Sequence, residues 1–301
     1  MWAESVAAIK DASRTALGVL EVLAWLGAEG LPEIVLGPLA SDPYDERDAL
    51  SVLASYSMVT RRSGAVSMHP LVQSAVRNSV MANGRADAVR ATAARLLLTA
   101  APDDPINNPT GWPMWAALLP HIQALVGDMP DDHESVAALD LQEGAALYLQ
   151  YQGNIDAAIT IFEQLLIDRE RILGPEHPDT LTARANLATA YQQAGRTSDA
   201  ITFFEQLLVD SERVLGSEHP QTLTARANLA TAYQQAGRTS DAITLLEQVL
   251  ADRVRVLGSE HPHTLTARAN LAAYRQAGHT ERSEPGAGAD PTRGSAGGGN
   301  G

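Results

Sequence analysis

One stretch of the sequence recurs without any change. The residues from Thr180 to Thr202 read TLTARANLATAYQQAGRTSDAIT, and the same string returns from Thr222 to Thr244. A third copy starts at Thr264 and keeps the first nine residues. Each copy therefore begins 42 residues after the previous one. Self-similarity at such a period is typical of an architecture made of similar stacked units.

Each period predicts two helices. The first runs from about 179 to 194, with apolar residues at helical spacing, and ends at Gly195, which can adopt the positive φ of a helix C-terminus. Thr197 or Ser198 is then expected to cap a second helix that ends near Gly216. A single pair of helices cannot bury its apolar face, so neighbouring pairs are expected to stack into a solenoid.

The same spacing places further helices on both sides of the identical copies. An earlier pair is predicted over 139–152 and 155–173, and a lone helix over 264–277. The lone helix has lost one residue between Asn270 and Tyr274, which turns its end by roughly 100° because an α-helix has 3.6 residues per turn. We interpret it as a degenerate cap of the solenoid.

The repeat resembles a known pattern. Leu187-Ala188-x-x-Tyr191, Gly195, Ala200-x-x-x-Phe204 and Pro220 are similar to the tetratricopeptide repeat (TPR). The period and the Leu-Gly-x-Glu-His-Pro connector resemble the kinesin-light-chain type of that repeat. HEAT and armadillo repeats have a similar period, but the tight glycine turn argues against them. The resemblance implies a right-handed solenoid of helical hairpins, which we expect over 138–278.

The first part of the chain has a different pattern. It predicts helices over 15–27, 44–56 and 71–81, and two short strands over 58–62 and 65–69. Ser63-Gly64 separates the two strands, which indicates a hairpin. Three helices with a terminal hairpin describe a small winged-helix domain, expected over 1–86. The predicted fold class is therefore all-α, with a winged-helix domain before the solenoid.

A second resemblance concerns this first part. The segment Tyr56 to Gln73 is similar to the winged-helix segment of STAND-type (NB-ARC) signalling ATPases, and Trp112-Pro113-Met114-Trp115 resembles their helical connector, expected here over 87–137. No G-x-x-x-x-G-K-[ST] motif of an ATPase occurs. The resemblance thus implies the sensor half of a larger switch, whose ATPase domain is absent.

Histidines in this sequence admit functional interpretations. The family's Met-His-Asp motif corresponds to Met68-His69, with Pro70 in place of the acid; in that family the histidine approaches the β-phosphate of ADP. We interpret His69 as a structural turn residue, or else as a nucleotide contact made through a separate NB-ARC ATPase chain. The periodic histidines His177, His219 and His261 belong to stacked helices about 8–10 Å apart, too far for one metal with bonds of about 2.0–2.1 Å. No metal site is predicted.

A polar stripe follows the first helix of each repeat. It combines threonine, asparagine and glutamine at helical spacing with an arginine two residues before each asparagine. In the TPR family the first helices line a concave groove, where amides can pair with a peptide backbone and arginines with carboxylates. The alternative is a solvated face copied by duplication. The predicted groove residues are Thr182, Arg184, Asn186, Thr189, Gln193, Thr224, Arg226, Asn228, Thr231, Gln235, Arg268 and Asn270.

Composition excludes several classes of function. The 301 residues carry a net charge of −14, which disfavours general binding of nucleic acid or of an anionic membrane. The chain has no cysteine, and Glu21 interrupts its longest apolar stretch, 16–28, so neither a thiol site nor a membrane span is expected. No catalytic or cofactor motif stands out. A cytoplasmic location and a disordered tail over 279–301 are predicted.

These patterns predict a non-catalytic protein- or peptide-binding scaffold, the sensor part of a STAND-like signalling system. The alternative function is a DNA-binding transcriptional regulator that uses the helix over 71–81. Its supporting residues are Arg61, Arg62, Arg77 and Arg85. A third hypothesis is an ATPase formed with a separate nucleotide-binding chain.

Overall fold

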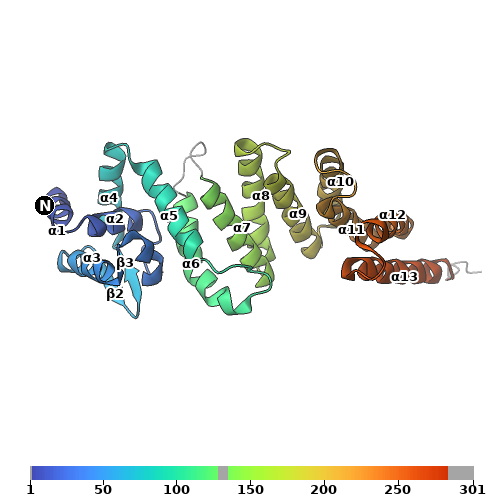
Figure 1. Ribbon diagram of the computed structural model, residues 1–301, viewed down its shortest axis with the longest axis horizontal. Coiled ribbons are helices and arrows are strands. Elements are labelled where there is room, and N and C mark those ends of the chain that lie inside the picture. The colour runs from blue at the N-terminus through green and yellow to red at the C-terminus, as the bar shows by residue number, and fades with distance from the viewer. Residues whose placement is uncertain (1, 128–134, 284–301) are drawn as a thin grey trace, which may run out of the picture. The chain divides into compact units, whose positions relative to one another are not determined.

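The computed structural model describes residues 2–127 and 135–283. The chain forms two compact units that divide between Ala194 and Gly195 (Figure 1). The division lies inside the repeats. The domain boundaries predicted near residues 86 and 137 stay predictions.

The first unit begins with short helices around a small sheet. The antiparallel sheet has the strand order β1-β3-β2, with Val66 of β3 opposite Leu31 and Arg61. The predicted hairpin corresponds to β2 and β3, and its Ser63 and Gly64 both have positive φ, as a type I′ turn requires. The elements are α1 (Trp2–Ala12), α2 (Arg14–Leu23), β1 (Leu31–Pro32), the 3-10 helix η1 (Glu33–Leu39), α3 (Pro43–Ser55), β2 (Thr60–Arg62), β3 (Ala65–Ser67) and α4 (Pro70–Ala82).

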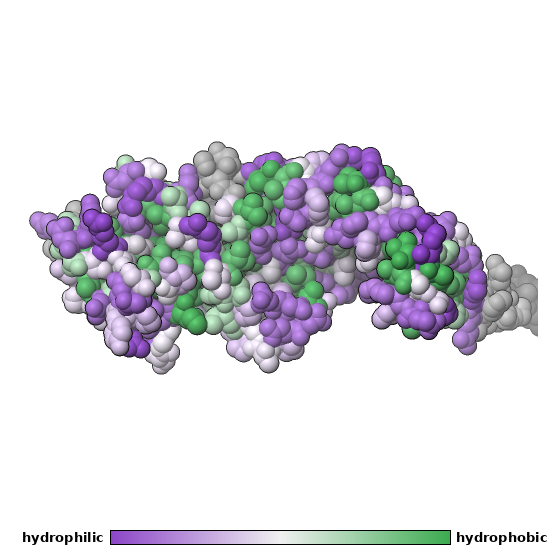
Figure 2. All heavy atoms as spheres, in the orientation of Figure 1, coloured by the Kyte–Doolittle hydropathy of each residue, from purple (hydrophilic) through white to green (hydrophobic). Residues whose placement is uncertain are grey.

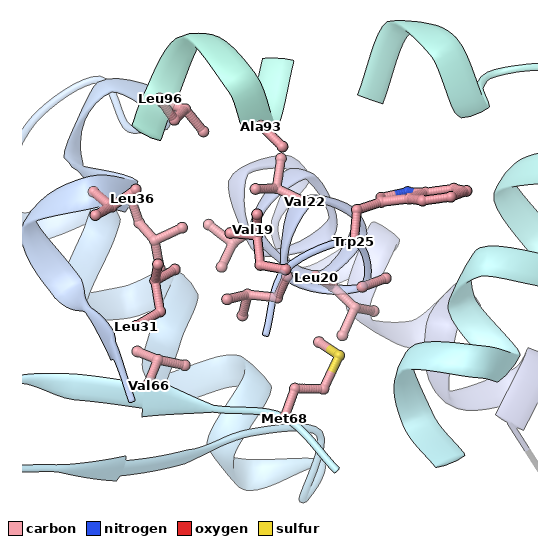
Figure 3. Packing of buried hydrophobic residues seen from close by; sticks show 14 of the residues in the cluster. Val19, Leu20, Val22, Trp25, Leu31, Leu36, Val66, Met68, Ala93 and Leu96 are labelled. Atoms are coloured by element: carbon pink, nitrogen blue, oxygen red, sulfur yellow. The ribbon is translucent and has the colours of Figure 1, made fainter. Parts of the chain in front are cut away.

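Helix α2 lies at the centre of the core of this unit. Figure 3 shows Val19, Leu20 and Val22 of α2 between the sheet residue Val66 on one side and Ala93 on the other. A buried amide holds the chain where α2 ends, since Gln73 Nε2 donates to the backbone oxygens of Leu23, the last residue of α2, and of Leu26. The Leu23 carbonyl is one of those that a helix end leaves without an intrahelical partner.

The same core continues into the following helices, which are α5 (Ala86–Ala100), the short 3-10 helix η2 (Pro109–Gly111) and α6 (Trp112–Gly127). Trp115 of α6 stacks on Tyr148 at 6.5 Å between ring centroids and donates a hydrogen bond to the Pro102 carbonyl. One hydrophobic cluster therefore extends from Ile9 to Ala145.

The repeats form the rest of the described chain. The helices are α7 (Val136–Tyr151), α8 (Ile155–Ile172), α9 (Pro178–Gln193), α10 (Thr197–Val214), α11 (Pro220–Gln235), α12 (Thr239–Leu257) and α13 (Pro262–Ser283). The first unit ends with α9 and the second begins with α10. Within residues 135–283 no strand occurs. Each unit thus contains consecutive antiparallel-type helical pairs of the length that the sequence predicts.

Glycines follow the first helices of the repeats, as the sequence predicts. Gly153, Gly195 and Gly237 have positive φ at the turn after each first helix. The predicted caps of the second helices are wrong, however. Helix α10 begins at Thr197 itself, and the preceding Arg196 makes no side-chain cap but pairs with Asp199 at 2.7 Å. An ion pair across the first turn replaces the hydroxyl cap.

The residue lost from the last helix changes which side chains face the preceding one. Tyr191 and Tyr233 donate hydrogen bonds to Glu163 and Glu205, each 28 residues earlier. In α13 the residue at that spacing is Arg275, which pairs with Glu247 at 2.7 Å. Tyr274 moves to the neighbouring face and contacts Thr231. The predicted rotation of the helix end is therefore confirmed.

The predicted tail over 279–301 overlaps the end of α13, and its remainder lies outside the described residues. Among the described helices none is both long and apolar enough to cross a bilayer. The face shown in Figure 2 is largely hydrophilic and carries several hydrophobic patches.

Gly144 of α7 tests the packing of α7 on α6. A Cβ atom at this position would overlap the indole of Trp115, which is fixed by Tyr148 and by Pro102. We expect Gly144→Ala to lower the free energy of unfolding by about 1–3 kcal/mol. Gly18→Ala in α2 is the control, because its Cβ meets nothing within 4 Å and alanine favours the helix by roughly 0.5–1 kcal/mol. Chemical denaturation measures both, and equal effects would contradict this packing.

His121 gives the first unit a pH-dependent stability. Burial lowers the pKa of the imidazole below 6.5, opposed in part by hydrogen bonds with the backbone of Gly30 and Gly27. Below pH 6.5 the unfolded chain takes up this proton before the native chain does. The free energy of unfolding should therefore decrease as the pH is lowered. For one proton the decrease is at most about 1.4 kcal/mol per pH unit. Denaturation of the wild type and His121→Gln from pH 8 to pH 5 should show a flatter slope for the variant, and parallel slopes would refute this role.

Candidate functional site

The predicted groove residues lie on α9, α11 and α13, the first helices of the repeats. Their threonine hydroxyls are used within their own helices. The Oγ1 atoms of Thr182, Thr189, Thr224 and Thr231 each donate to the carbonyl four residues earlier, at 2.8–3.1 Å. These threonines therefore have no hydroxyl proton left to offer a ligand, although their oxygens can still accept.

The arginines of the repeat point away from solvent. Arg184 is buried and pairs with Glu170 at 2.7 Å, and Arg226 is buried between Glu212 and Asp252, both at 2.6 Å. The guanidinium groups are thus engaged by the protein's own carboxylates. They tie α9 to α8, and α11 to α10 and α12.

Arg268 occupies the same repeat position in α13 and is exposed. The glutamate found 14 residues before Arg184 and Arg226 is replaced here by Val254. Leu265 is exposed as well, whereas the equivalent Leu223 is buried. In α13 this face therefore keeps the residues of the repeat without the acid that pairs with them in the earlier copies.

The asparagines differ from one repeat to the next. Asn186 Nδ2 donates to Glu143 of α7 at 2.7 Å. Asn228 and Asn270 are half-buried, and neither side chain makes a hydrogen bond within residues 2–127 and 135–283. Gln193 accepts a bond from the buried Gln150, whereas Gln235 is exposed. Free amide groups of the stripe are thus found in the second unit, on α11 and α13.

Two arginines that sequence reasoning missed lie on the second helices of the repeats. Arg169 of α8 is buried beneath the stripe and donates to Asp140, to Glu143 and to the Asp179 carbonyl. Arg253 of α12 follows it by 84 residues and donates to the His263 carbonyl. The signal that could have found them is this doubled period, since the intervening repeat has Ser211 at the same position.

The periodic histidines are helix caps. The Nδ1 atoms of His177, His219 and His261 each accept the backbone N–H two residues later, at 3.2–3.3 Å. His69 does the same at the start of α4, at 3.2 Å from Leu71 N. Among the residues that the structure describes, no three His, Asp or Glu side chains gather as a metal would require.

His69 also lines a cavity of about 240 Å³ beside β3. The charged residue of the lining is Glu29, and no arginine or lysine contributes to it. Two arginines of this region are paired, Arg61 with Glu33 at 2.8 Å and Arg85 with Glu21, whereas Arg62 of β2 is exposed. The region therefore offers little positive charge to a phosphate group.

Comparisons with known proteins agree with the repeat architecture. Residues 136–209 and 222–263 match family profiles of the tetratricopeptide repeat. No curated protein matches the chain. The chain thus contains tetratricopeptide repeats in both of its units.

Solved structures include similar proteins. A kinesin light chain candidate from Podosopora anserina with nearly identical TPR-like repeats is 29% identical over 69% of this chain and 89% of its own, with a TM-score of 0.47. A variant of that protein is 27% identical over the same shares, also with a TM-score of 0.47. BtubC (BKLC) from P. vanneervenii is 13% identical over 98% of this chain and 97% of its own, with a TM-score of 0.42.

Glu143 tests the buried charge network of the first unit. Its carboxylate accepts hydrogen bonds from Arg169 and Asn186, so Glu143→Ala leaves a buried cation short of a partner. We expect a loss of about 3 kcal/mol in the free energy of unfolding, at the lower end for a broken buried pair because Asp140 still contacts Arg169. The control, Glu247→Ala, removes an exposed pair with Arg275 and should cost at most about 1 kcal/mol. Chemical denaturation measures both variants. If Glu143→Ala lowers the free energy of unfolding no more than Glu247→Ala does, the buried network does not contribute as proposed.

Proposed function

We propose that the chain is a non-catalytic scaffold that binds an extended peptide or protein segment along the first helices of its repeats. The observation that carries this proposal is the pair of half-buried amides on α11 and α13, Asn228 and Asn270, which have no hydrogen-bond partner among the described residues. Tetratricopeptide repeats are typical of protein-interaction scaffolds, which supports the same function.

The chemistry of these amides suits a peptide backbone. Each carboxamide offers two donors and an acceptor, which matches the N–H and C=O groups of an extended chain. Packed helices lie about 8–10 Å apart, and an extended chain rises about 3.3 Å per residue. Successive first helices would therefore meet the ligand backbone about every third residue, and the exposed Gln235 adds a further contact on α11.

The double substitution Asn228→Ala and Asn270→Ala tests the groove. Loss of two hydrogen bonds of about 0.5–1.5 kcal/mol each should weaken peptide binding roughly tenfold. An array of random-sequence peptides identifies binders of the full chain, and fluorescence anisotropy then measures each dissociation constant. Asn78→Ala, an exposed asparagine of α4, is the matched control. Absence of any binder, or unchanged affinity in the double variant, would exclude the groove.

We further propose that this scaffold is the sensor part of a STAND-like cytoplasmic signalling system. In this proposal residues 1–86 form a winged-helix domain, 87–137 a helical connector and 138–278 the sensing solenoid, and a separate NB-ARC chain supplies the ATPase. The order of helices around the β2–β3 hairpin and the Met68-His69 sequence support it. Thermal denaturation with ADP tests the nucleotide role of His69: stabilisation that is lost in His69→Ala supports it, and no stabilisation of the chain with its ATPase partner opposes it.

DNA binding through α4 is the second function open to the same domain. The ion pairs of Arg61 and Arg85 reduce the charge that it needs, and Arg77 is also engaged within the protein. A gel shift at low salt decides the question, because phosphate contacts give a steep dependence of affinity on salt. A shifted band whose intensity decreases steeply with salt would support DNA binding. If no such band is seen, DNA binding is excluded.

A further inference from the structure

The two units carry the same buried arginine in different surroundings. In the first unit Arg169 is 1% exposed and donates to the Asp179 carbonyl at 3.0 Å, to Glu143 at 2.8 Å and to Asp140 at 3.3 Å. Asn186 donates to the other oxygen of Glu143 at 2.7 Å. One carboxylate is therefore held between a guanidinium and an amide.

The second unit repeats this arrangement 84 residues later. Arg253 is 7% exposed and donates to the His263 carbonyl at 3.0 Å, the counterpart of the bond from Arg169 to Asp179. The residues at the positions of the two acids are Thr224 and Ala227. Asn270 stands at the position of Asn186. Both donors are kept in the second unit, while the carboxylate between them is not.

Among the described residues, Arg253 is accordingly a buried cation without an acidic partner. Burial lowers the pKa of its guanidinium, and no carboxylate acts against this shift. A buried charge is costly unless it is paired and fully hydrogen-bonded. Ala227 carries only a methyl group at the position where the first unit has the side chain of Glu143.

We propose that the second unit binds a ligand carboxylate at this position, between Arg253 and Asn270 and above Ala227. The inference rests on the proposed groove, and it names the chemistry of the ligand as an acidic peptide. Its carboxylate accepts a charge-assisted hydrogen bond from the Arg253 guanidinium and a second bond from Asn270 Nδ2. Such bonds are shorter and stronger than those between neutral groups. Arg253 and Asn270 are the residues that select an acid in this position.

A small probe tests the site without any peptide. The full chain labelled with nitrogen-15 is titrated with N-acetyl-glutamate, and with N-acetyl-glutamine as the neutral match, at constant ionic strength. The Nε–H resonance of Arg253, assigned by its loss in Arg253→Lys, should shift saturably with the glutamate probe and not with the glutamine probe. Absence of a saturable shift, or equal shifts with the two probes, overturns the proposal.

Ala227→Glu supplies the missing carboxylate from the chain itself. The variant should melt at a higher temperature than the wild type, and its Arg253 resonance should no longer respond to N-acetyl-glutamate. Ala185→Glu is the matched control, because it adds the same charge at the same repeat position, where Ser211 follows at the spacing at which Arg253 follows Ala227. A probe response that persists in Ala227→Glu shows that the carboxylate binds elsewhere, which contradicts the site.

Peptides separate this inference from the groove proposal. For each peptide that the groove binds, replacing one acid by its amide should weaken binding about tenfold or more, as for a hydrogen bond to a charged group. Peptides with a free or an amidated C-terminus distinguish a side-chain carboxylate from a terminal one. If acid and amide forms bind the wild type equally, the carboxylate inference fails and the groove stands. If no peptide binds, the groove proposal fails. The titration with N-acetyl-glutamate then still tests whether the second unit binds a carboxylate.

Discussion

Each helical hairpin of this protein buries its apolar side against the helices next to it in its unit. The constraint is visible at one repeat position, where Phe162, Phe204 and Leu246 are at most 1% exposed. A helix pair of this size has too little apolar surface to form a core by itself, so the residues that meet a neighbour must keep their size and polarity. The stripe residues of α9 and α11 are identical, and what differs between them is the set of partners that their side chains meet.

Charged groups inside the repeats follow the same logic. Arg226 is buried with two acids and links three helices, while Arg169 links α8 to α7 and to the start of α9. Ion pairs of this kind add little net stability, because desolvation offsets the Coulomb attraction, but they penalise any arrangement that leaves a charge unpaired. They thereby favour one register of each hairpin on the next.

The two units consequently offer different surfaces to a ligand. In the first unit Glu143 already occupies the amide of Asn186. In the second unit Asn228 and Asn270 have no such acceptor, and the buried Arg253 has no acid, among the residues that the structure describes. The proposed binding position in the second unit therefore comes from the few places where nearly identical repeats differ, since similar backbones present different side chains.

Local sequence patterns predict the helices of the repeats, their glycine turns and the strongly repeated positions, but not α1, β1 or η1. The positive-φ glycines and the β2–β3 hairpin depend on interactions between residues close together in the sequence. Such interactions, like the repeat period, can be recognised as sequence patterns. The partners of the stripe residues were decided by tertiary structure. The strings around Asn186 and Asn228 are identical, yet one asparagine is bonded and the other is not. The physical reason is that the acceptor comes from the preceding hairpin, 43 residues away in the sequence, so no local pattern contains it.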